Sequence, residues 1–188
     1  MKRRCEWGNS SEIYQKYHDE EWGVPVYDDL KLFEFLVLES AQAGLSWITI
    51  LKRRDGYRKA FANYDPVEVA KFNEKKMDEL MADPSIIRNR RKIEATVSNA
   101  KAFVQVQKEF GSFSNYIWNF VGGKPIVNHY KELSEIPAQT ELSVQISKDL
   151  KKRGFRFLGP TIVYSHMQAT GLVNDHLEYC FRYHELMM

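Results

Sequence analysis

Residues able to bind a transition metal lie in two pairs at opposite ends of the 188-residue chain. Cys5 and His18 form the first pair, whereas His176 and Cys180 are about one helical turn apart and can face a single ion. Two cysteines and two histidines have the number and chemistry of a closed structural zinc site. One zinc ion bound by all four would join the two ends of the chain and stabilise the fold.

Other interpretations of these residues stay open. The four residues could be unrelated, because a His-x-x-x-Cys spacing is common by itself. The chain has 2 cysteines, and the fact that both fall in such pairs favours zinc. A disulfide between Cys5 and Cys180 would also join the ends, but reducing compartments disfavour it. The remaining histidines have no comparable partners and are expected on the surface or in the core: His129, His166 and His184.

Aromatic residues are dense in the first third of the chain, namely Trp7, Tyr14, Tyr17, Trp22 and Trp47. Aromatic residues usually belong to a core, but flat rings with polar tips also suit a pocket that stacks an extruded base. Glu39 lies in a very apolar segment, where a helix would place it on one face with Leu36 and Ala43. A partly buried carboxylate without a nearby cation is a candidate functional group. The alternative is a glutamate on the helix surface.

A glycine-bounded hairpin between residues 150 and 162 is suited to bind a DNA phosphate. A basic helix end is followed by an apolar turn and then by a helix that begins at Pro160–Thr161. The free backbone N–H groups and the dipole of that second helix would attract an anion. The candidate DNA-binding residues are Lys152, Arg153, Gly154, Gly159 and Thr161. The pattern is similar to the helix-hairpin-helix element of DNA repair glycosylases, although a plain pair of helices fits it as well.

The charge of the chain is nearly balanced, with a formal net charge of +2. Basic residues dominate between Ser85 and Pro125, and a second basic group lies near the end: Lys148, Lys151, Lys152, Arg153 and Arg156. Together these stretches could form one DNA-facing patch. On charge alone, solvated helix faces are the more common explanation of such stretches.

Hydrophobic periodicity and capping residues predict an all-α fold with short connections. Helices are expected from residues 10–12 up to Gly23, over 30–43, 47–54, 86–110, 113–121, 142–152 and 161–170, with short ones opened by Asp65–Pro66 and Asn73–Glu74. Strand-like alternation is almost absent. The length indicates one domain, 1–188, or a compact two-lobed one. No apolar run predicts a membrane span or a secretory signal, so we expect a cytoplasmic protein.

Several motifs along nearly the whole chain resemble those of the 3-methyladenine-DNA glycosylase I family, a branch of the helix-hairpin-helix glycosylase superfamily. In the family's order they are Tyr17–Pro25, Leu38–Trp47, Ile86–Ile93, Lys151–Phe155 and Gly171–His176. The resemblance implies a helix-hairpin-helix glycosylase fold with one structural zinc ion that ties the terminal segments together. It also implies a monomeric DNA repair enzyme that flips out and excises 3-methyladenine from double-stranded DNA.

The resemblance assigns roles to individual residues. It implies that Glu39 hydrogen-bonds the adenine edge, that Tyr17 lies beside it, and that the base stacks on Trp47. It further implies that Tyr14 and Trp22 line the pocket, with Trp7 in the same aromatic group, and that Cys5, His18, His176 and Cys180 bind zinc. The loop Gly44–Leu45 corresponds to the segment thought to fill the gap left in the duplex.

One position departs from the superfamily pattern. In Leu172–His176 the usual catalytic aspartate is replaced by Asn174, which cannot act as a carboxylate base. Because methylation at N3 makes adenine cationic and weakens its glycosidic bond, strong catalysis by an acid is unnecessary. No lysine occurs between Gly159 and Asp175, so we expect a monofunctional enzyme that leaves an abasic site.

Three other functions remain open at this stage. The chain could be a non-catalytic DNA-binding module, which would leave a buried Glu39 among aromatic rings without a purpose. It could be a zinc-stabilised protein-interaction domain, which would show no salt-dependent affinity for DNA. It could also be a glycosylase for a different cationic purine.

Overall fold

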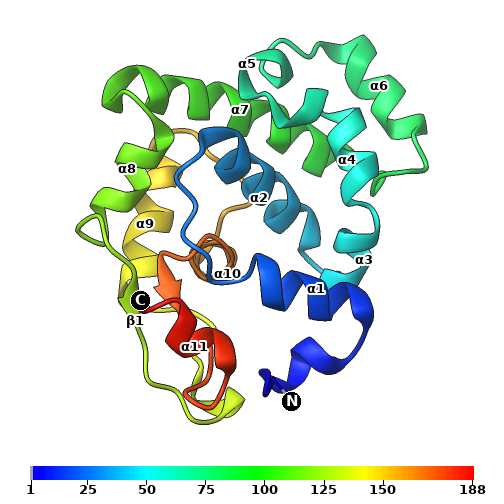
Figure 1. Ribbon diagram of the computed structural model, residues 1–188. Coiled ribbons are helices and arrows are strands. Elements are labelled where there is room, and N and C mark those ends of the chain that lie inside the picture. Colours follow the sequence, from blue (N-terminus) through cyan, green and yellow to red (C-terminus); the bar gives the residue numbers. More distant parts are fainter. Residues whose placement is uncertain (1) are drawn as a thin grey trace.

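The structure, a computed structural model, describes residues 2–188 and consists mostly of helices (Figure 1). The α-helices are α1 (Glu12–Glu20), α2 (Asp29–Gln42), α3 (Trp47–Lys52), α4 (Arg54–Ala60), α5 (Pro66–Val69), α6 (Glu74–Ala82), α7 (Arg90–Phe110), α8 (Phe113–Asn119), α9 (Glu141–Lys152), α10 (Pro160–Ala169) and α11 (Phe181–Glu185). The 3₁₀ helices are η1 (Glu6–Asn9), η2 (Ala62–Tyr64) and η3 (Leu133–Glu135). None of the helices in this part of the chain is long and apolar enough to cross a membrane.

One very short parallel strand pair accompanies the helices. β1 (Ile126–Val127) pairs with β2 (Val173–Asn174), with Ile126 opposite Val173. The prediction of a helical fold is therefore confirmed, but this pair was missed. Two-residue strands have no alternation to detect, because tertiary contacts alone bring the two segments together.

The central element is α2, which packs against α3, α4, α7, α8 and α10 (Figure 1). Residues 32–41 are all buried, so the helix is enclosed on every side. It begins where the side chain of Asp28 accepts a hydrogen bond from Lys31 N at 2.9 Å. The carboxylate of Asp29 accepts hydrogen bonds from Phe113 N and Ser114 N at the start of α8. These contacts fix the register of the helix that carries Glu39.

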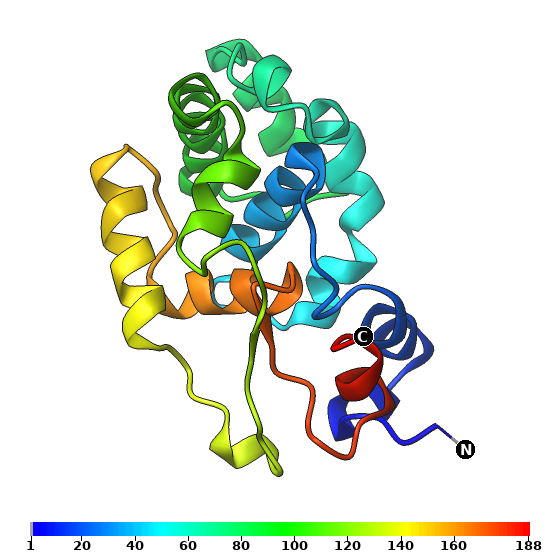
Figure 2. The same ribbon diagram turned by 60° about the vertical axis from the view of Figure 1, so that its left-hand side comes forward.

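The two ends of the chain lie side by side, with α11 next to the N-terminal segment (Figures 1 and 2). The amide of Phe181 donates a hydrogen bond to the carbonyl of Arg3 at 2.9 Å. A small buried cluster, separate from the main core, contains Cys5, Leu177, Cys180 and Tyr183. The ends are therefore held by local contacts around the two cysteines.

Several predicted helix limits were wrong. The helix expected from Ile86 begins only at Arg90, because Ile87 N donates to the hydroxyl of Tyr57 and Asn89 caps the helix. The helix expected over 47–54 is interrupted at Arg53, and α4 follows it. In addition, η1 and α11 were not expected, since neither has enough residues to show a helical period.

Lys92 on α7 braces the C-terminal end of α2. Its Nζ donates hydrogen bonds to the carbonyls of Ala41 at 2.8 Å and Ala43 at 2.7 Å. Carbonyls at a helix C-terminus have no partner within the helix, and a cation there also interacts favourably with the helix dipole. Burial lowers the pKa of Lys92. One side chain thus fixes the end of α2 and the loop after it.

We predict that Lys92→Met lowers the free energy of unfolding by about 1–2 kcal/mol, because two carbonyls lose a charged donor. Urea denaturation would measure the change, and Lys92→Arg should recover part of it. The matched control is Lys101→Met, which removes an exposed lysine from the same helix. Equal losses in the Lys92 and Lys101 variants would show that the brace contributes nothing.

Candidate active site and metal-binding cluster

A cavity of about 270 Å³ lies between η1, α1, α2, α3 and α10. Its walls are formed by Trp7, Tyr14, Tyr17, Trp22, Glu39, Gln42, Trp47, Ser165 and Gln168. All of the aromatic residues predicted from the first third of the chain are among them, together with Glu39. The volume is near the lower limit for ligand pockets, so the cavity suits a small, flat molecule.

The aromatic walls pack on one another at angles that leave open ring faces. Trp7 meets Trp22 edge-on with 5.1 Å between ring centroids and Tyr14 at 5.8 Å. Tyr17 and Trp47 are tilted by 53° with their centroids 5.6 Å apart. The hydroxyl of Tyr14 accepts a hydrogen bond from Ile48 N at 3.0 Å, which fixes the start of α3. Within the described residues the buried Trp47 Nε1 has no hydrogen-bond partner.

Glu39 is buried at the base of this cavity, with 3% of its surface exposed. Burial raises the pKa of its carboxyl to about 8, and across residues 2–188 no ion pair offsets the loss of solvent. Glu34 on the same helix is equally buried but forms an ion pair with Arg54 at 2.7 Å. The pKa of Tyr17 is raised well above its usual value by burial and by the charge of Glu39. Glu39 is therefore a carboxyl group that the fold leaves without a cation.

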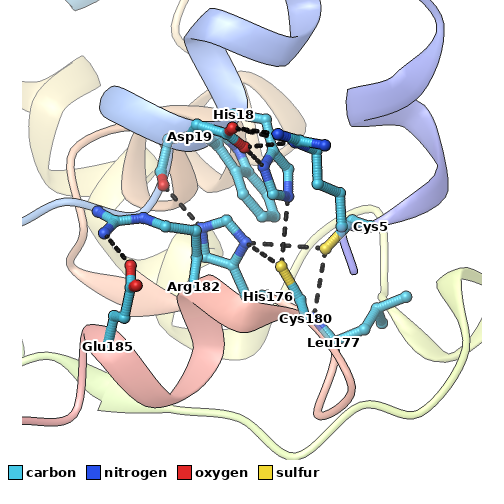
Figure 3. A network of polar contacts seen from close by, with 10 residues as sticks. Cys5, His18, Asp19, His176, Leu177, Cys180, Arg182 and Glu185 are labelled. Carbon is cyan, nitrogen blue, oxygen red and sulfur yellow. Dashed lines mark hydrogen bonds and ion pairs between the residues drawn. The ribbon is translucent and has the colours of Figure 1, made fainter. Parts of the chain in front are cut away.

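Side chains from both ends of the chain converge on a second site, in which Cys5, His18, His176 and Cys180 are all buried (Figure 3). Their ligand atoms lie within 4.8 Å of one another. The Sγ of Cys180 is 3.5 Å from His18 Nε2 and 3.5 Å from His176 Nδ1, and Cys5 Sγ is 3.7 Å from His176 Nδ1. The four residues predicted from the sequence to share one metal ion therefore lie around one point in the structure.

The outer nitrogen of each histidine is hydrogen-bonded away from the cluster. Nδ1 of His18 contacts Asp19 Oδ1 at 2.8 Å, and Asp19 is itself paired with Arg4 at 2.8 Å. Nε2 of His176 contacts the carbonyl of Trp22 at 2.8 Å. Each histidine thus donates its N–H outward and keeps the lone pair of its other nitrogen toward the cysteines (Figure 3). The amide of Leu177 donates to Cys5 Sγ at 3.4 Å.

The cluster and the cavity share residues and contacts. Trp7 packs edge-on against His18 with 5.1 Å between centroids, and Trp22 packs against His176 at 4.7 Å. Gly8 is required beside them, because a Cβ at that position would come within 2.8 Å of the His18 ring. The cluster therefore holds the aromatic wall of the cavity in place.

The predicted DNA-binding residues lie in and around two turns, one after α2 and one between α9 and α10. Gly44 has a φ of 80° after the end of α2, and Leu45 next to it is 37% exposed. In the hairpin between α9 and α10, Lys152, Gly154, Gly159 and Thr161 are exposed. Asn99 clamps this hairpin, since its side chain donates to Arg156 O at 2.9 Å and accepts from Arg156 N at 2.7 Å.

Arg153 differs from the other hairpin residues. Its guanidinium is paired with Asp149 and Glu109 at 2.7 Å each, and it lies over the rings of Phe110 and Tyr116. A phosphate contact by Arg153 would require these ion pairs to break. The helix sequence alone did not reveal the pair with Glu109, because Glu109 is on another helix.

Neither Asn174 nor Asp175 is among the residues that line the cavity. Asn174 donates to Tyr183 O and accepts from His176 N, each at 3.2 Å. Asp175 accepts hydrogen bonds from Asn128 and Gln168. The departure from the superfamily pattern at Asn174 therefore corresponds to a residue that supports His176 in the cluster of cysteines and histidines.

Three cavity residues were missed in the sequence: Gln42, Ser165 and Gln168. Gln42 follows Glu39 by three positions on α2, and Ser165 and Gln168 have the same spacing on α10. A polar pair at a spacing of three on an otherwise apolar helix would have indicated a shared polar face.

Fold and cavity together define a helical protein with an aromatic-lined cavity beside a buried carboxyl group. The chain belongs to the methyladenine glycosylase family, which it matches over residues 7–183.

Named relatives agree with this assignment. The chain is 50% identical over 180 residues to the DNA-3-methyladenine glycosylase of Haemophilus influenzae, covering 96% of this chain and 97% of that one. It is equally similar to DNA-3-methyladenine glycosylase 1 of Escherichia coli, covering 96% of each. A solved tyrosine-to-phenylalanine variant of 3-methyladenine DNA glycosylase I, in complex with 3-methyladenine, is 41% identical, with a TM-score of 0.92 and coverage of 95% and 96%.

We predict that Glu39→Gln stabilises the protein increasingly as pH rises. The pKa of Glu39 is raised from its usual 4.5 to about 8, so the folded state holds a proton that the unfolded chain has lost between these values. The stability of the wild type should therefore fall across this window, and glutamine should remove that fall, with an upper limit of roughly 5 kcal/mol.

Urea denaturation at a series of pH values from 4 to 9 would test this. Glu34→Gln is the matched control, because it breaks an ion pair on the same helix and should destabilise the protein. A constant difference between wild type and Glu39→Gln across the pH series would contradict the prediction.

Proposed function

We propose that the protein is a DNA repair glycosylase that excises 3-methyladenine from alkylated duplex DNA by hydrolysing the N-glycosidic bond, leaving an abasic site. The observation that carries the proposal is the cavity in which an unpaired, buried Glu39 meets an aromatic wall. Membership of the methyladenine glycosylase family and the names of the relatives support the same activity. The protein is expected to act as a monomer.

The cavity selects a base that has been flipped out of the duplex. Flipping costs a few kcal/mol, and stacking on an aromatic ring such as Trp47 returns about 1–3 kcal/mol per base. Tyr14, Tyr17, Trp7 and Trp22 complete the aromatic enclosure.

Glu39 provides discrimination by charge. In the free protein burial holds its pKa near 8, so the carboxyl is protonated at neutral pH. A cationic base placed beside it lowers that pKa and favours the carboxylate, which attracts the cation and accepts a hydrogen bond from its amine. Neutral adenine offers no such charge. Because methylation has already weakened the glycosidic bond, the enzyme needs no further strong acid.

Two loops are proposed to contact the duplex. Leu45, presented by the turn at Gly44, would fill the space that the flipped base leaves. The α9–α10 pair would act as a helix-hairpin-helix, with Gly159 and Thr161 offering backbone N–H groups at the start of α10 to a phosphate. Lys152 and Gly154 lie at the end of the preceding helix. We assign Arg153 a bracing function within the hairpin and expect its ion pairs to persist on DNA.

We also propose that the Cys5, His18, His176 and Cys180 cluster binds one structural zinc ion. A tetrahedral zinc site with the usual bond lengths has S–N edges of about 3.6 Å, and the S–N distances here are 3.5–3.7 Å. The pKa of Cys180 is lowered by its hydrogen bond from Cys5 and by the two histidines, which favours the metal-binding thiolate. The ion would cross-link the two ends of the chain. With four protein ligands it would have no coordination position open for substrate.

Excision is tested by incubating the purified protein with DNA methylated by a simple alkylating agent and identifying the released bases by chromatography. We expect release of 3-methyladenine, with 7-methylguanine retained. Glu39→Gln should lower the rate about 10- to 100-fold, because a charge-assisted hydrogen bond is lost. Glu34→Gln should keep the rate while losing stability. No release by the wild type would favour a binding module, and release of another cationic purine alone would change the assigned substrate.

Zinc is tested by elemental analysis and thermal unfolding. We expect one zinc per chain, and Cys180→Ser should lose the metal and unfold at least 10 °C lower, because a long loop is no longer closed. His184→Ala removes an exposed histidine near the same end and serves as the control. A metal-free protein with the stability of the untreated sample would refute the proposal.

A further inference from the structure

Asp175 is a buried carboxylate surrounded by neutral donors. It is 1% exposed, and its oxygens accept hydrogen bonds from Asn128 Nδ2 at 2.7 Å, from Gln168 Nε2 at 2.9 Å and from the hydroxyl of Tyr164. Across residues 2–188 no lysine or arginine forms an ion pair with it. A buried charge without a cation is costly, so a position that keeps one calls for a functional explanation.

Gln168 connects this carboxylate to the base cavity. It lies on α10, lines the cavity with Ser165, and donates its Nε2 to Asp175. Its backbone carbonyl accepts a hydrogen bond from Gly23 N at 2.9 Å, which holds this part of α10 against the end of α1. Gln168 therefore contacts Asp175 and lines the cavity at the same time.

The chemistry of the pair fixes the orientation of the Gln168 amide. The hydrogen bond from Gln168 Nε2 to Asp175 Oδ2, at 2.9 Å, turns the NH₂ group of Gln168 toward Asp175, so its Oε1 must face elsewhere. The charge of Asp175 also polarises the amide and makes that oxygen a stronger acceptor. Since Gln168 lines the cavity, the free oxygen is available to a molecule inside it.

We propose that Gln168 is a specificity-determining residue that presents Oε1 to the exocyclic group of the flipped base, and that Asp175 is the positioning residue that fixes this orientation. Adenine carries an amine at that position, which donates to an acceptor, whereas guanine carries a carbonyl oxygen, which an acceptor repels. The pair thereby selects methylated adenine over methylated guanine. The inference rests on the proposed glycosylase function and names how its site distinguishes the two purines.

Asp175→Asn is the most informative change, because it keeps the shape and removes the charge. An asparagine can offer its NH₂ to Gln168, so the Gln168 amide is free to turn and to present its own NH₂ to the cavity. We expect the affinity for free 3-methyladenine to fall about tenfold. The affinity for 3-methylguanine, which has a carbonyl oxygen in place of the amine, should rise or stay constant.

Both affinities can be measured by tryptophan fluorescence titration, since three tryptophans line the cavity. Gln168→Leu removes the acceptor itself and should reduce the preference for 3-methyladenine by a similar factor even if Asp175→Asn does not fold. Asn128→Ala is the matched control, because it removes another donor to Asp175 without reaching the cavity. It should lower the unfolding temperature and leave the preference unchanged.

The preference for 3-methyladenine over 3-methylguanine decides the proposal. An unchanged preference in both Gln168→Leu and Asp175→Asn overturns it, as does an equal loss of preference in Asn128→Ala. Excision by the wild type in the chromatographic assay is measured in parallel. If the wild type excises 3-methyladenine while the variants keep its preference, this inference fails and the proposed function stands. If the wild type excises nothing, both fall.

Discussion

The convergence of Cys5, His18, His176 and Cys180 on one point is the constraint on which the site depends. The N-terminal segment has little core of its own, because η1 and α1 bury only a few side chains. Trp7 follows Cys5 by two positions, Tyr17 precedes His18, and the carbonyl of Trp22 accepts a hydrogen bond from His176. Trp7 and Tyr17 are thus within two residues of a cluster residue in the sequence, and Trp22 is hydrogen-bonded to one through its backbone. Joining the chain ends is how the fold holds these rings steady without a larger core.

The opposite side of the cavity depends on the burial of α2. A helix that is enclosed on all sides can hold a carboxyl group away from water, but only if its remaining contacts offset the cost. Asp28, Asp29 and Lys92 fix both ends of this helix, and Glu34 is neutralised by Arg54. Glu39 alone among its buried acids is left without a partner cation in the described residues. A ligand that brings a positive charge removes this desolvation cost. The unfavourable burial of Glu39 in the free protein therefore strengthens the binding of a cationic ligand.

Much of the fold and of the candidate site could be predicted from the sequence, for identifiable reasons. Capping residues such as Asp65 and Asn73 act on the next few amides, and their helices begin where expected. The cysteine and histidine pairs were predicted from residue type and spacing, which restrict the chemistry to few choices. The polar contacts that escaped prediction are tertiary. Gln168 contacts Asp175, which follows it by 7 positions but lies beyond the end of α10, and Glu109 contacts Arg153, which is 44 positions away. No pattern within a single helix marks either pairing.

A single helix, α7, links the two loops that are proposed to contact DNA. Lys92 holds the end of α2 ahead of Gly44–Leu45, and Asn99 clamps the hairpin before α10. The two residues are about 10 Å apart along the helix axis. Flipping a base requires a fixed distance between the residue that fills the gap and the residues that hold the phosphates. If that distance could vary, the duplex would close again. A rigid helix braced at both points provides that fixed distance, which explains why a half-buried lysine and a buried asparagine are placed on it.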